Sequence, residues 1–259
     1  MLDIQQIESF YPEKLRAYKR NLLREYLQYK ILEIIFDSKY GEKLPFMGGT
    51  AIRVVHSNTR FSEDLDFDNL GLEEKDFAAM VTLIQKKMEL QGYGVEIKNT
   101  FKGAYRSYIR IPDVLFDNEI SKHRSEKLLI EVDTEPQNYE YTPDKVIINR
   151  FDVFLQINAV PVDVLLAQKI YAIFKRKRAM GRDFYDAVYL SGKTKVNLSY
   201  LKLKLNIKDA ADLKRRLLLR CKKFDFKQLA RDAEPFLFTP SDAKKVLFFE
   251  DYIRGYDFW

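Results

Sequence analysis

The sequence predicts an α/β (α+β) protein, in which a mixed sheet with flanking helices is followed by a helical C-terminal part. Strand-like segments occur only before about residue 160, whereas helical spacing of apolar residues continues to the end of the chain. The charge changes at the same point. Residues 1–160 carry 22 Lys and Arg against 26 Asp and Glu, a net charge of −4, and residues 161–259 carry 22 against 12, a net charge of +10. We therefore divide the chain into an α/β domain, residues 1–160, and a basic helical domain, residues 161–259.

The composition is that of an ordinary globular protein. The chain has 259 residues, of which 46% are hydrophobic and 32% charged, enough for one large or two modest cores. No apolar run approaches the length of a membrane span, and the first residues lack the pattern of a signal peptide. The single cysteine, Cys221, excludes an internal disulfide framework. These features predict a cytoplasmic protein with no membrane partner.

Local patterns predict the elements in order. Apolar residues at helical spacing indicate a long helix over 12–38 and a second over 73–90, which ends at Gly92. Segments rich in Val, Ile, Tyr and Leu predict strands at 95–99, 105–111, 128–134 and 146–157, the last with a break near Asn149. After residue 160 the pattern predicts helices over 162–178, 183–190, 198–204, 209–223, 226–233 and 241–252.

Between the first two helices, the stretch 46–68 contains two features suited to phosphate chemistry. The first is Gly48-Gly49-Thr50, which lies between an apolar run and a short helix-like run. Glycines at a strand-to-helix turn let backbone amides approach a ligand closely, and a helix N-terminus attracts anions. A Gly-Gly pair also commonly marks a simple turn, so this feature alone leaves both interpretations open.

The second feature is Asp64-Leu65-Asp66, in which acidic and apolar residues alternate. On a strand this alternation buries the apolar side chains and directs both carboxylates to the same face. Two such carboxylates suit hard divalent cations, which prefer oxygen ligands and can bridge nucleotide phosphates. An acidic strand face can equally be only solvated. The order of the two features and their short separation favour the phosphate-binding interpretation.

Further candidate residues lie outside this stretch. Glu131 and Asp133 share one face of the strand predicted at 128–134, which could also be a simple exposed acidic face. Lys169 lies on the inner stripe of the helix predicted at 162–178, where a lysine can extend to the surface or reach a phosphate. Asp183 and Asp186 share one face at the start of the next helix, where acids are often only partners of the helix dipole.

Two sequence blocks resemble the AbiEii/AbiGii abortive-infection family of nucleotidyltransferase-like toxins. The first is Gly-Gly-Thr followed, after a short helix, by Arg-Phe-Ser-Glu-Asp-Leu-Asp-Phe at residues 60–67. The family belongs to the polymerase-beta type superfamily, whose signature is Gly-[Gly/Ser] followed by Asp-x-Asp. The second is Ala-x-Lys-x-x-Ala at 167–172, followed by basic residues and Arg-Asp-x-x-Asp at 182–186. The blocks span residues 46–190, and in this chain Asp186 is not directly followed by the family's Leu.

The resemblance implies a nucleotidyltransferase-type sheet, an NTP substrate and Mg²⁺ or Mn²⁺ as cofactor. It implies that the metal is held by Asp64, Asp66 and Glu131, with Asp133 as the alternative third acid. The residues expected to take part in catalysis are Asp64, Asp66, Lys169 and Asp183. Gly48, Gly49 and Thr50 are expected to hold the triphosphate of the nucleotide. Arg53, Arg60 and Ser62 are expected to orient the phosphates or the acids. Lys169 and Asp183 are expected to complete the site from the helical side.

The resemblance also implies the toxin of a toxin–antitoxin or phage-defence module. The expected reaction moves a nucleoside monophosphate from an NTP to an acceptor, plausibly the 3′ end of tRNA, and a cognate antitoxin is an expected partner. A basic second part suits a polyanion such as RNA, and no DNA partner is predicted. Two alternatives remain open: transfer to a protein or small-molecule hydroxyl, and a non-catalytic RNA-binding module of the same fold.

Overall fold

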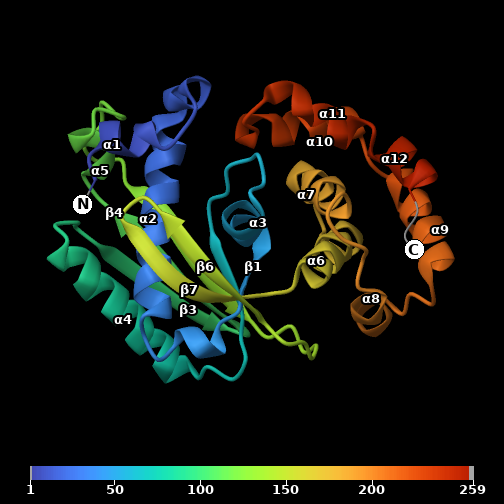
Figure 1. Cartoon of the computed structure of the whole chain (residues 1–259), viewed down its shortest axis with the longest axis horizontal. Helices are drawn as coiled ribbons and strands as arrows, with labels where there is room; N and C mark the ends of the chain where they lie inside the picture. The colour runs from blue at the N-terminus through green and yellow to red at the C-terminus, as the bar shows by residue number, and fades with distance from the viewer. Residues whose placement is uncertain (1, 257–259) are drawn as a thin grey trace. The chain divides into compact units, whose positions relative to one another are not determined.

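The computed structural model describes residues 2–256, which form two compact units (Figure 1). The first unit comprises the residues up to His56 together with Phe61–Asn138 and Pro143–Ala159. The second comprises Ser57–Arg60, Tyr139–Thr142 and the residues from Val160 onward. The sequence analysis assigned the two short segments to residues 1–160. Both belong to the second unit, where the hydroxyl of Thr59 contacts that of Tyr185 and the hydroxyl of Tyr139 donates to Asn197.

The first unit is built on a seven-stranded sheet of order β3-β4-β5-β2-β1-β7-β6. The β1–β7 and β2–β5 pairs are parallel and the others antiparallel, so the predicted mixed sheet is confirmed. The strands are β1 (Phe46–Met47), β2 (Leu65–Asp68), β3 (Glu96–Lys102), β4 (Ala104–Ile111), β5 (Leu128–Glu135), β6 (Asp144–Arg150) and β7 (Val153–Ala159).

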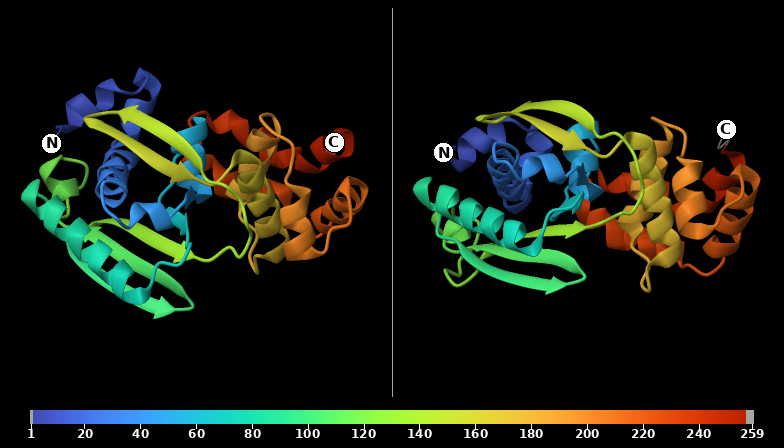
Figure 2. Two further views of the ribbon diagram at one scale, coloured as in Figure 1. Left: turned by 60° about the horizontal axis from the view of Figure 1, so that its bottom comes forward. Right: turned by 90° about the horizontal axis from the view of Figure 1, so that it is seen from below.

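The helices of the first unit are α1 (Ile4–Ser9), η1 (Glu13–Tyr18), α2 (Lys19–Phe36), η2 (Gly41–Lys43), α3 (Gly48–His56), α4 (Glu74–Leu90) and α5 (Val114–Asp117). Helix α2 contacts β5, β7 and α4, whereas α4 packs on β3 and β4. Figure 2 shows that the sheet is strongly curved, with the β6–β7 hairpin on one side of α2 and strands β3–β5 on the other. The core therefore lies around α2, which buries twelve of its residues.

Several boundaries differ from the sequence prediction for local reasons. The segment predicted as one helix over 12–38 begins with the 3₁₀ helix η1 before α2. The break predicted near Asn149 lies two residues later, where Phe151 takes a positive φ of 58° between β6 and β7. The short helix α1 was missed, although Asp3 and Gln6 form a capping box at its start.

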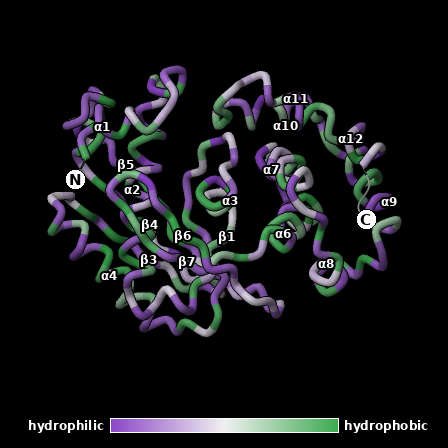
Figure 3. The backbone as a smooth tube through the Cα atoms, viewed as in Figure 1, coloured by the Kyte–Doolittle hydropathy of each residue, from purple (hydrophilic) through white to green (hydrophobic). Residues whose placement is uncertain are grey.

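The second unit is helical, as predicted. Its elements are α6 (Val162–Lys175), α7 (Gly181–Ser191), α8 (Leu198–Leu205), α9 (Ala210–Cys221), α10 (Phe226–Ala233), η3 (Glu234–Phe236), η4 (Pro240–Ala243), α11 (Lys244–Leu247) and α12 (Phe249–Gly255). The single helix predicted over 241–252 is thus three short helical pieces. Hydrophobic residues, green in Figure 3, concentrate in α3 of the first unit and in α6 of the second.

Helix α7 is central to the second unit, because it packs against α6, α10 and α11. Phe184 is fully buried there and makes edge-to-face contacts with three other rings, at centroid distances of 4.9–5.5 Å. At the start of α7, Gly181 allows a close approach to α10. A Cβ atom at this position would lie 1.9 Å from the carbonyl oxygen of Leu229.

The 57–60 segment joins α3 to the chain that leads into β2, and it is anchored within the second unit. The carbonyl of Thr59 accepts a hydrogen bond from the amide of Phe238 at 3.0 Å, and Arg60 forms an isolated antiparallel bridge with Leu237. The hydroxyls of Thr59 and Tyr185 lie 2.9 Å apart. Four residues after this segment ends, the chain carries Asp64 in the first unit.

No helix of the described residues is apolar over enough of its length to cross a bilayer.

We expect Gly181→Ala to destabilise the second unit, because the new methyl group would overlap backbone atoms of α10. Overpacking of this kind typically costs about 1–3 kcal/mol, which corresponds to a melting-temperature decrease of roughly 2–10 °C. The matched control is Gly192→Ala, where φ is −77° and the nearest neighbouring atom to a new Cβ lies 3.6 Å away. Thermal unfolding followed by circular dichroism measures both, and equal melting temperatures for the two variants would contradict the close helix approach.

Candidate active site

In the first unit, the Gly48-Gly49-Thr50 turn leads directly from β1 into α3, as predicted. Gly48 has a positive φ of 76°, and a Cβ atom there would lie 2.1 Å from Oδ2 of Asp66. This proximity follows from the sheet register, in which Met47 pairs with Asp66 across the antiparallel β1–β2 ladder. A side chain at position 48 would therefore collide with the carboxylate of Asp66. Glycine, which has no Cβ atom, allows the backbone to lie this close to the carboxylate.

Thr50 is buried and supports the chain that carries Asp64. Its hydroxyl donates a hydrogen bond of 2.5 Å to the backbone carbonyl of Asp64, and its exposed fraction is 1%. In this structure Thr50 therefore positions Asp64, and its predicted contact with a nucleotide stays a prediction. Gly49 is also buried, so the turn presents backbone rather than side chains at the N-terminus of α3.

The Asp-x-Asp pair lies where the alternation predicted it. Leu65 and Phe67 in β2 are fully buried, whereas Asp64 and Asp66 are half-buried. Asp68, the next acid of the same parity, is 1% exposed and accepts a hydrogen bond of 2.8 Å from the amide of Gln137. Asp64 and Asp66 are thus accessible acids, whereas Asp68 is a structural acid; Glu63, which is also half-buried, pairs with Arg24 at 3.1 Å.

The register of β5 places the candidate third acids beside this pair. Asp133 pairs with Asp66 across the parallel β2–β5 ladder, and its Oδ1 lies 2.6 Å from Nε of Arg106. Glu131 lies 3.8 Å from the same nitrogen. Burial raises the pKa of Glu131; the nearby charge of Arg106 opposes this shift, and that of Asp133 adds to it. Of the two acids left open by the sequence, Asp133 is held by Arg106 and Glu131 is held less closely.

The donor set fits a magnesium ion only in part. Mg²⁺ is usually held by one or two carboxylates together with substrate phosphates and water, and Asp64 and Asp66 offer two carboxylates on one strand face. Within residues 2–256, however, no group of three or more Asp, Glu, His or Cys side chains is assembled so that it could hold a metal ion. The fit therefore relies on two protein carboxylates and on oxygens from a bound nucleotide.

Two predicted nucleotide-binding residues lie near the Asp-x-Asp pair in sequence but have other contacts. Arg53 in α3 forms a two-pronged ion pair with Glu25 in α2, with both nitrogen–oxygen distances 3.0 Å. Its guanidinium is engaged there, so its role toward a nucleotide stays a prediction. Ser62 is half-buried, and its carbonyl accepts a hydrogen bond of 3.2 Å from Gln28.

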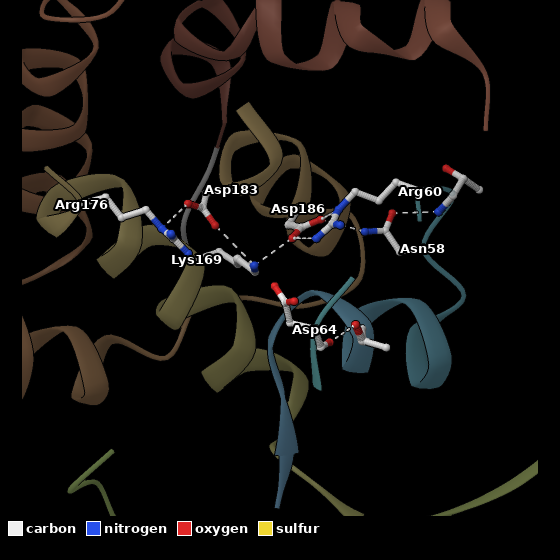
Figure 4. Close-up of polar contacts among 9 residues, drawn as sticks. Asn58, Arg60, Asp64, Lys169, Arg176, Asp183 and Asp186 are labelled. Carbon is white, nitrogen blue, oxygen red and sulfur yellow. Dashed lines mark hydrogen bonds and ion pairs between the residues drawn. The ribbon is translucent and has the colours of Figure 1, made fainter. Parts of the chain in front are cut away.

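In the second unit, the structure brings Lys169 and Asp183 together, as the second motif implied. The ammonium of Lys169, on α6, lies 3.4 Å from Oδ1 of Asp183, on α7 (Figure 4). Oδ2 of Asp183 lies 2.8 Å from Nε of Arg176, which follows the last turn of α6. The side chain of Lys169 is 12% exposed and that of Asp183 is 4% exposed, whereas that of Arg176 is 52% exposed.

Asp186 and Arg60 form the most buried ion pair of this cluster, a pairing that no sequence pattern predicted. The two nitrogen–oxygen distances are both 2.6 Å, and the side chains are 0% and 2% exposed. Burial alone would raise the pKa of Asp186, but the charges of Arg60 and Lys169 outweigh it and lower the pKa to about 2. The i, i+3 spacing of the two acids in Arg-Asp-x-x-Asp was the available signal; Arg60, the partner of Asp186, lies 126 positions earlier in the chain.

The comparisons with known proteins agree with these observations. The family described as nucleotidyl transferase AbiEii toxin, type IV TA system, matches residues 30–250. The chain belongs to this family. It is therefore a nucleotidyltransferase toxin of the type IV toxin–antitoxin class, and the resemblance recognised from the two motifs is confirmed.

Solved structures show the same fold. The chain resembles JHP933 from Helicobacter pylori with a TM-score of 0.55 and 18% identity, over 90% of this chain and 91% of that one. It resembles a candidate nucleotidyltransferase from H. pylori with a TM-score of 0.54 and 18% identity, over 90% and 93%. No curated protein matches the chain. At this identity the two structures establish the fold, and the family match establishes the class of enzyme.

We expect Gly48→Ala to abolish nucleotidyl transfer, because its methyl group would displace the carboxylate of Asp66. Gly71→Ala is the matched control, since Gly71 also has a positive φ, of 86°, but no atom within 4 Å of a new Cβ. Both variants carry the backbone strain of a left-handed residue, about 1–2 kcal/mol. Transfer assays beside thermal unfolding separate the two effects, and equal activity in both variants would show that the Asp66 contact is unimportant.

We expect Asp186→Asn to lower the free energy of unfolding at neutral pH by about 3–5 kcal/mol, because Arg60 is left buried without its counter-charge. The pKa of Asp186 is depressed in the folded state, so its ionised form stabilises the protein above the unfolded-state pKa. That contribution is lost as the pH falls from about 4 towards about 2. The difference between wild type and variant should therefore shrink over this range in denaturant titrations. A difference independent of pH would contradict the assignment.

Proposed function

We propose that this toxin transfers a nucleoside monophosphate from an NTP to a hydroxyl at the 3′ end of tRNA, with release of pyrophosphate and dependence on Mg²⁺ or Mn²⁺. The observation that carries the proposal is the contact between the glycine turn and Asp66, whose carboxylate fills the space that a side chain at position 48 would need. Such a contact sets a helix N-terminus, which attracts phosphate, beside carboxylates that attract a divalent cation.

Within the first unit, the roles follow from the geometry of that contact. The backbone at Gly48 and Gly49 would bind the triphosphate at the start of α3. Asp64 and Asp66 would hold the metal ion, which neutralises charge on the phosphates when bound. Glu131 would act as the third acid. Its raised pKa favours proton acceptance. The alternative acid, Asp133, is engaged by Arg106.

The chemical step is a displacement at phosphorus. The oxygen of the acceptor hydroxyl bonds to the α-phosphorus of the NTP, and the bond from that phosphorus to the β-phosphate oxygen breaks. Pyrophosphate carries the released electron pair, and the hydroxyl proton passes to a carboxylate, for which we propose Glu131. Positioning and charge neutralisation account for the catalysis, and no covalent intermediate with the protein is needed.

Lys169 and Asp183 of the second unit would also be required for transfer. Lys169 is a half-buried point charge that suits a phosphate oxygen. Its ammonium lies 3.4 Å from Asp183, a distance that leaves it donor capacity for another partner. Of the described residues in this cluster, three are basic and two are acidic. The surplus of positive charge supports binding of an anionic group.

The choice of RNA as acceptor is supported by the charge of residues 161–259, which include 22 basic and 12 acidic residues, a net charge of +10. Polyanion binding by such a region would weaken steeply as salt concentration rises. Membership of a toxin–antitoxin family suggests a cognate antitoxin as a further partner, and inhibition of translation would follow if the modified tRNA ends cannot be aminoacylated.

The test is incubation of the purified protein with total tRNA, Mg²⁺ and each labelled NTP in turn, beside Asp64→Asn and Lys169→Met. We expect label on RNA from wild type and a decrease of at least about 100- to 1,000-fold in both variants, since each loses one charge that acts in the transition state. Lys75→Met, which removes an exposed lysine paired with Glu73, is the control and should retain full activity.

Other outcomes are equally informative. Label on a protein or small molecule in place of RNA would retain the chemistry and replace the acceptor. Full transfer by Asp64→Asn, with a circular dichroism spectrum like that of wild type, would refute the assignment of the acid pair. Binding of tRNA without any NTP binding would favour a non-catalytic RNA-binding module.

A further inference from the structure

The carboxylate of Asp186 has its hydrogen-bonding capacity filled by donors of the second unit (Figure 4). Its Oδ1 accepts from Nδ2 of Asn58 at 2.8 Å and from Nε of Arg60 at 2.6 Å. Its Oδ2 accepts from Nη2 of Arg60 at 2.6 Å and lies 2.9 Å from the ammonium of Lys169. A carboxylate offers about four lone-pair sites, so all of them are occupied.

Asp183, one turn earlier on the same helix face, has a different environment. Its contact with Lys169 is 3.4 Å, longer than the 2.9 Å contact between Lys169 and Asp186. Its second oxygen is paired with Arg176, a side chain that is half exposed. Lys169 is therefore held mainly by the interior acid, Asp186, and only loosely by the acid nearer to solvent.

Asp186 also anchors the 57–60 segment. Asn58 and Arg60, both of this segment, supply three of the four donors to its carboxylate. The neighbouring residue of α7, Tyr185, contacts Thr59 of the same segment. One acid thus fixes both the ammonium of Lys169 and the segment that precedes the Asp-x-Asp pair in the chain.

We propose that Asp186 is a positioning residue, which holds the Lys169 ammonium from its buried side so that its remaining donor capacity is directed at a substrate phosphate. The part of this proposal that concerns phosphate rests on the proposed function, whereas the fixing of Lys169 does not. A buried ion pair can be replaced by apolar side chains of similar volume without loss of folding, since the desolvation cost of both charges is removed at once. If the pair were purely stabilising, the folded replacement would keep the transfer activity of wild type.

The test is the double variant Arg60→Met with Asp186→Leu, which removes the ion pair and leaves no unpaired charge from it. Its matched control is Arg254→Met with Glu250→Leu, which removes another ion pair of the second unit. Two readouts are taken on each protein. One is the acylation rate of Lys169 by an amine-reactive ester, followed by peptide mass spectrometry, with Lys214 of the same unit as internal reference. The other is kcat and KM of transfer.

We expect the double variant to fold with a melting temperature close to that of wild type. Lys169 should be acylated about 10-fold faster relative to Lys214, because it has lost its closest ion-pair partner. The kcat should fall about 100-fold with a much smaller change in the KM for NTP, as expected when a charged group loses its orientation. The control variant should match wild type in both readouts.

An unchanged acylation rate of Lys169, or undiminished transfer by the folded double variant, would overturn the proposal. If the double variant does not fold, Asp186→Asn is measured at a temperature at which circular dichroism shows it folded, and the same two results decide. Absence of transfer by wild type would count against the proposed function alone, because the acylation rate still decides whether Asp186 fixes Lys169.

Discussion

The buried ion pair of Arg60 with Asp186 is the interaction on which the cluster of charged residues in the second unit depends. Two charges removed from water are costly unless their geometry is close and their remaining donors and acceptors are satisfied. Here both conditions hold, because the pair is two-pronged and Asn58 and Lys169 complete the carboxylate. The pair also fixes its surroundings, because the 57–60 segment and α7 each contribute one member of it and α6 contributes Lys169, which contacts Asp186. Loss of Asp186 would leave Arg60 buried without its counter-charge.

In the first unit the corresponding constraint is the sheet register. The antiparallel pairing of Met47 with Asp66 places the carboxylate of Asp66 next to the glycine turn. The parallel pairing of Asp66 with Asp133 places a third acid on the neighbouring strand, directly beside Asp66. Nε of Arg106 forms an ion pair with Oδ1 of Asp133 at 2.6 Å and lies 3.8 Å from Glu131, so Glu131 is the less engaged acid. The short strand β1 has only two residues, but it determines which atoms the α3 N-terminus faces. The same register explains why Gly48 has no substitute.

The elements most accurately predicted from sequence were those whose hydrophobic period is unbroken. Helix α4 lies at Glu74–Leu90 against a predicted 73–90, and β5 at Leu128–Glu135 against a predicted 128–134. Accuracy fell where short pieces are held by contacts distant in sequence. The three helical pieces over 240–255 follow no continuous period, and the 57–60 segment has no element of its own. Its residues carry polar groups whose partners are supplied by α7 and by the chain around Leu237.

By itself the sequence determined the α/β class, the helical second part, the family, and the presence of Gly48, Asp64, Asp66, Lys169 and Asp183 as candidate residues. These depend on local spacing and motif order, which are legible along the chain. Only the tertiary structure decided that Thr50 supports Asp64, that Arg53 is engaged by Glu25, and that Asp186 is the interior partner of Lys169. A side chain's role depends on which groups fold against it, and the partner of Asp186 lies 126 positions away, beyond any local pattern.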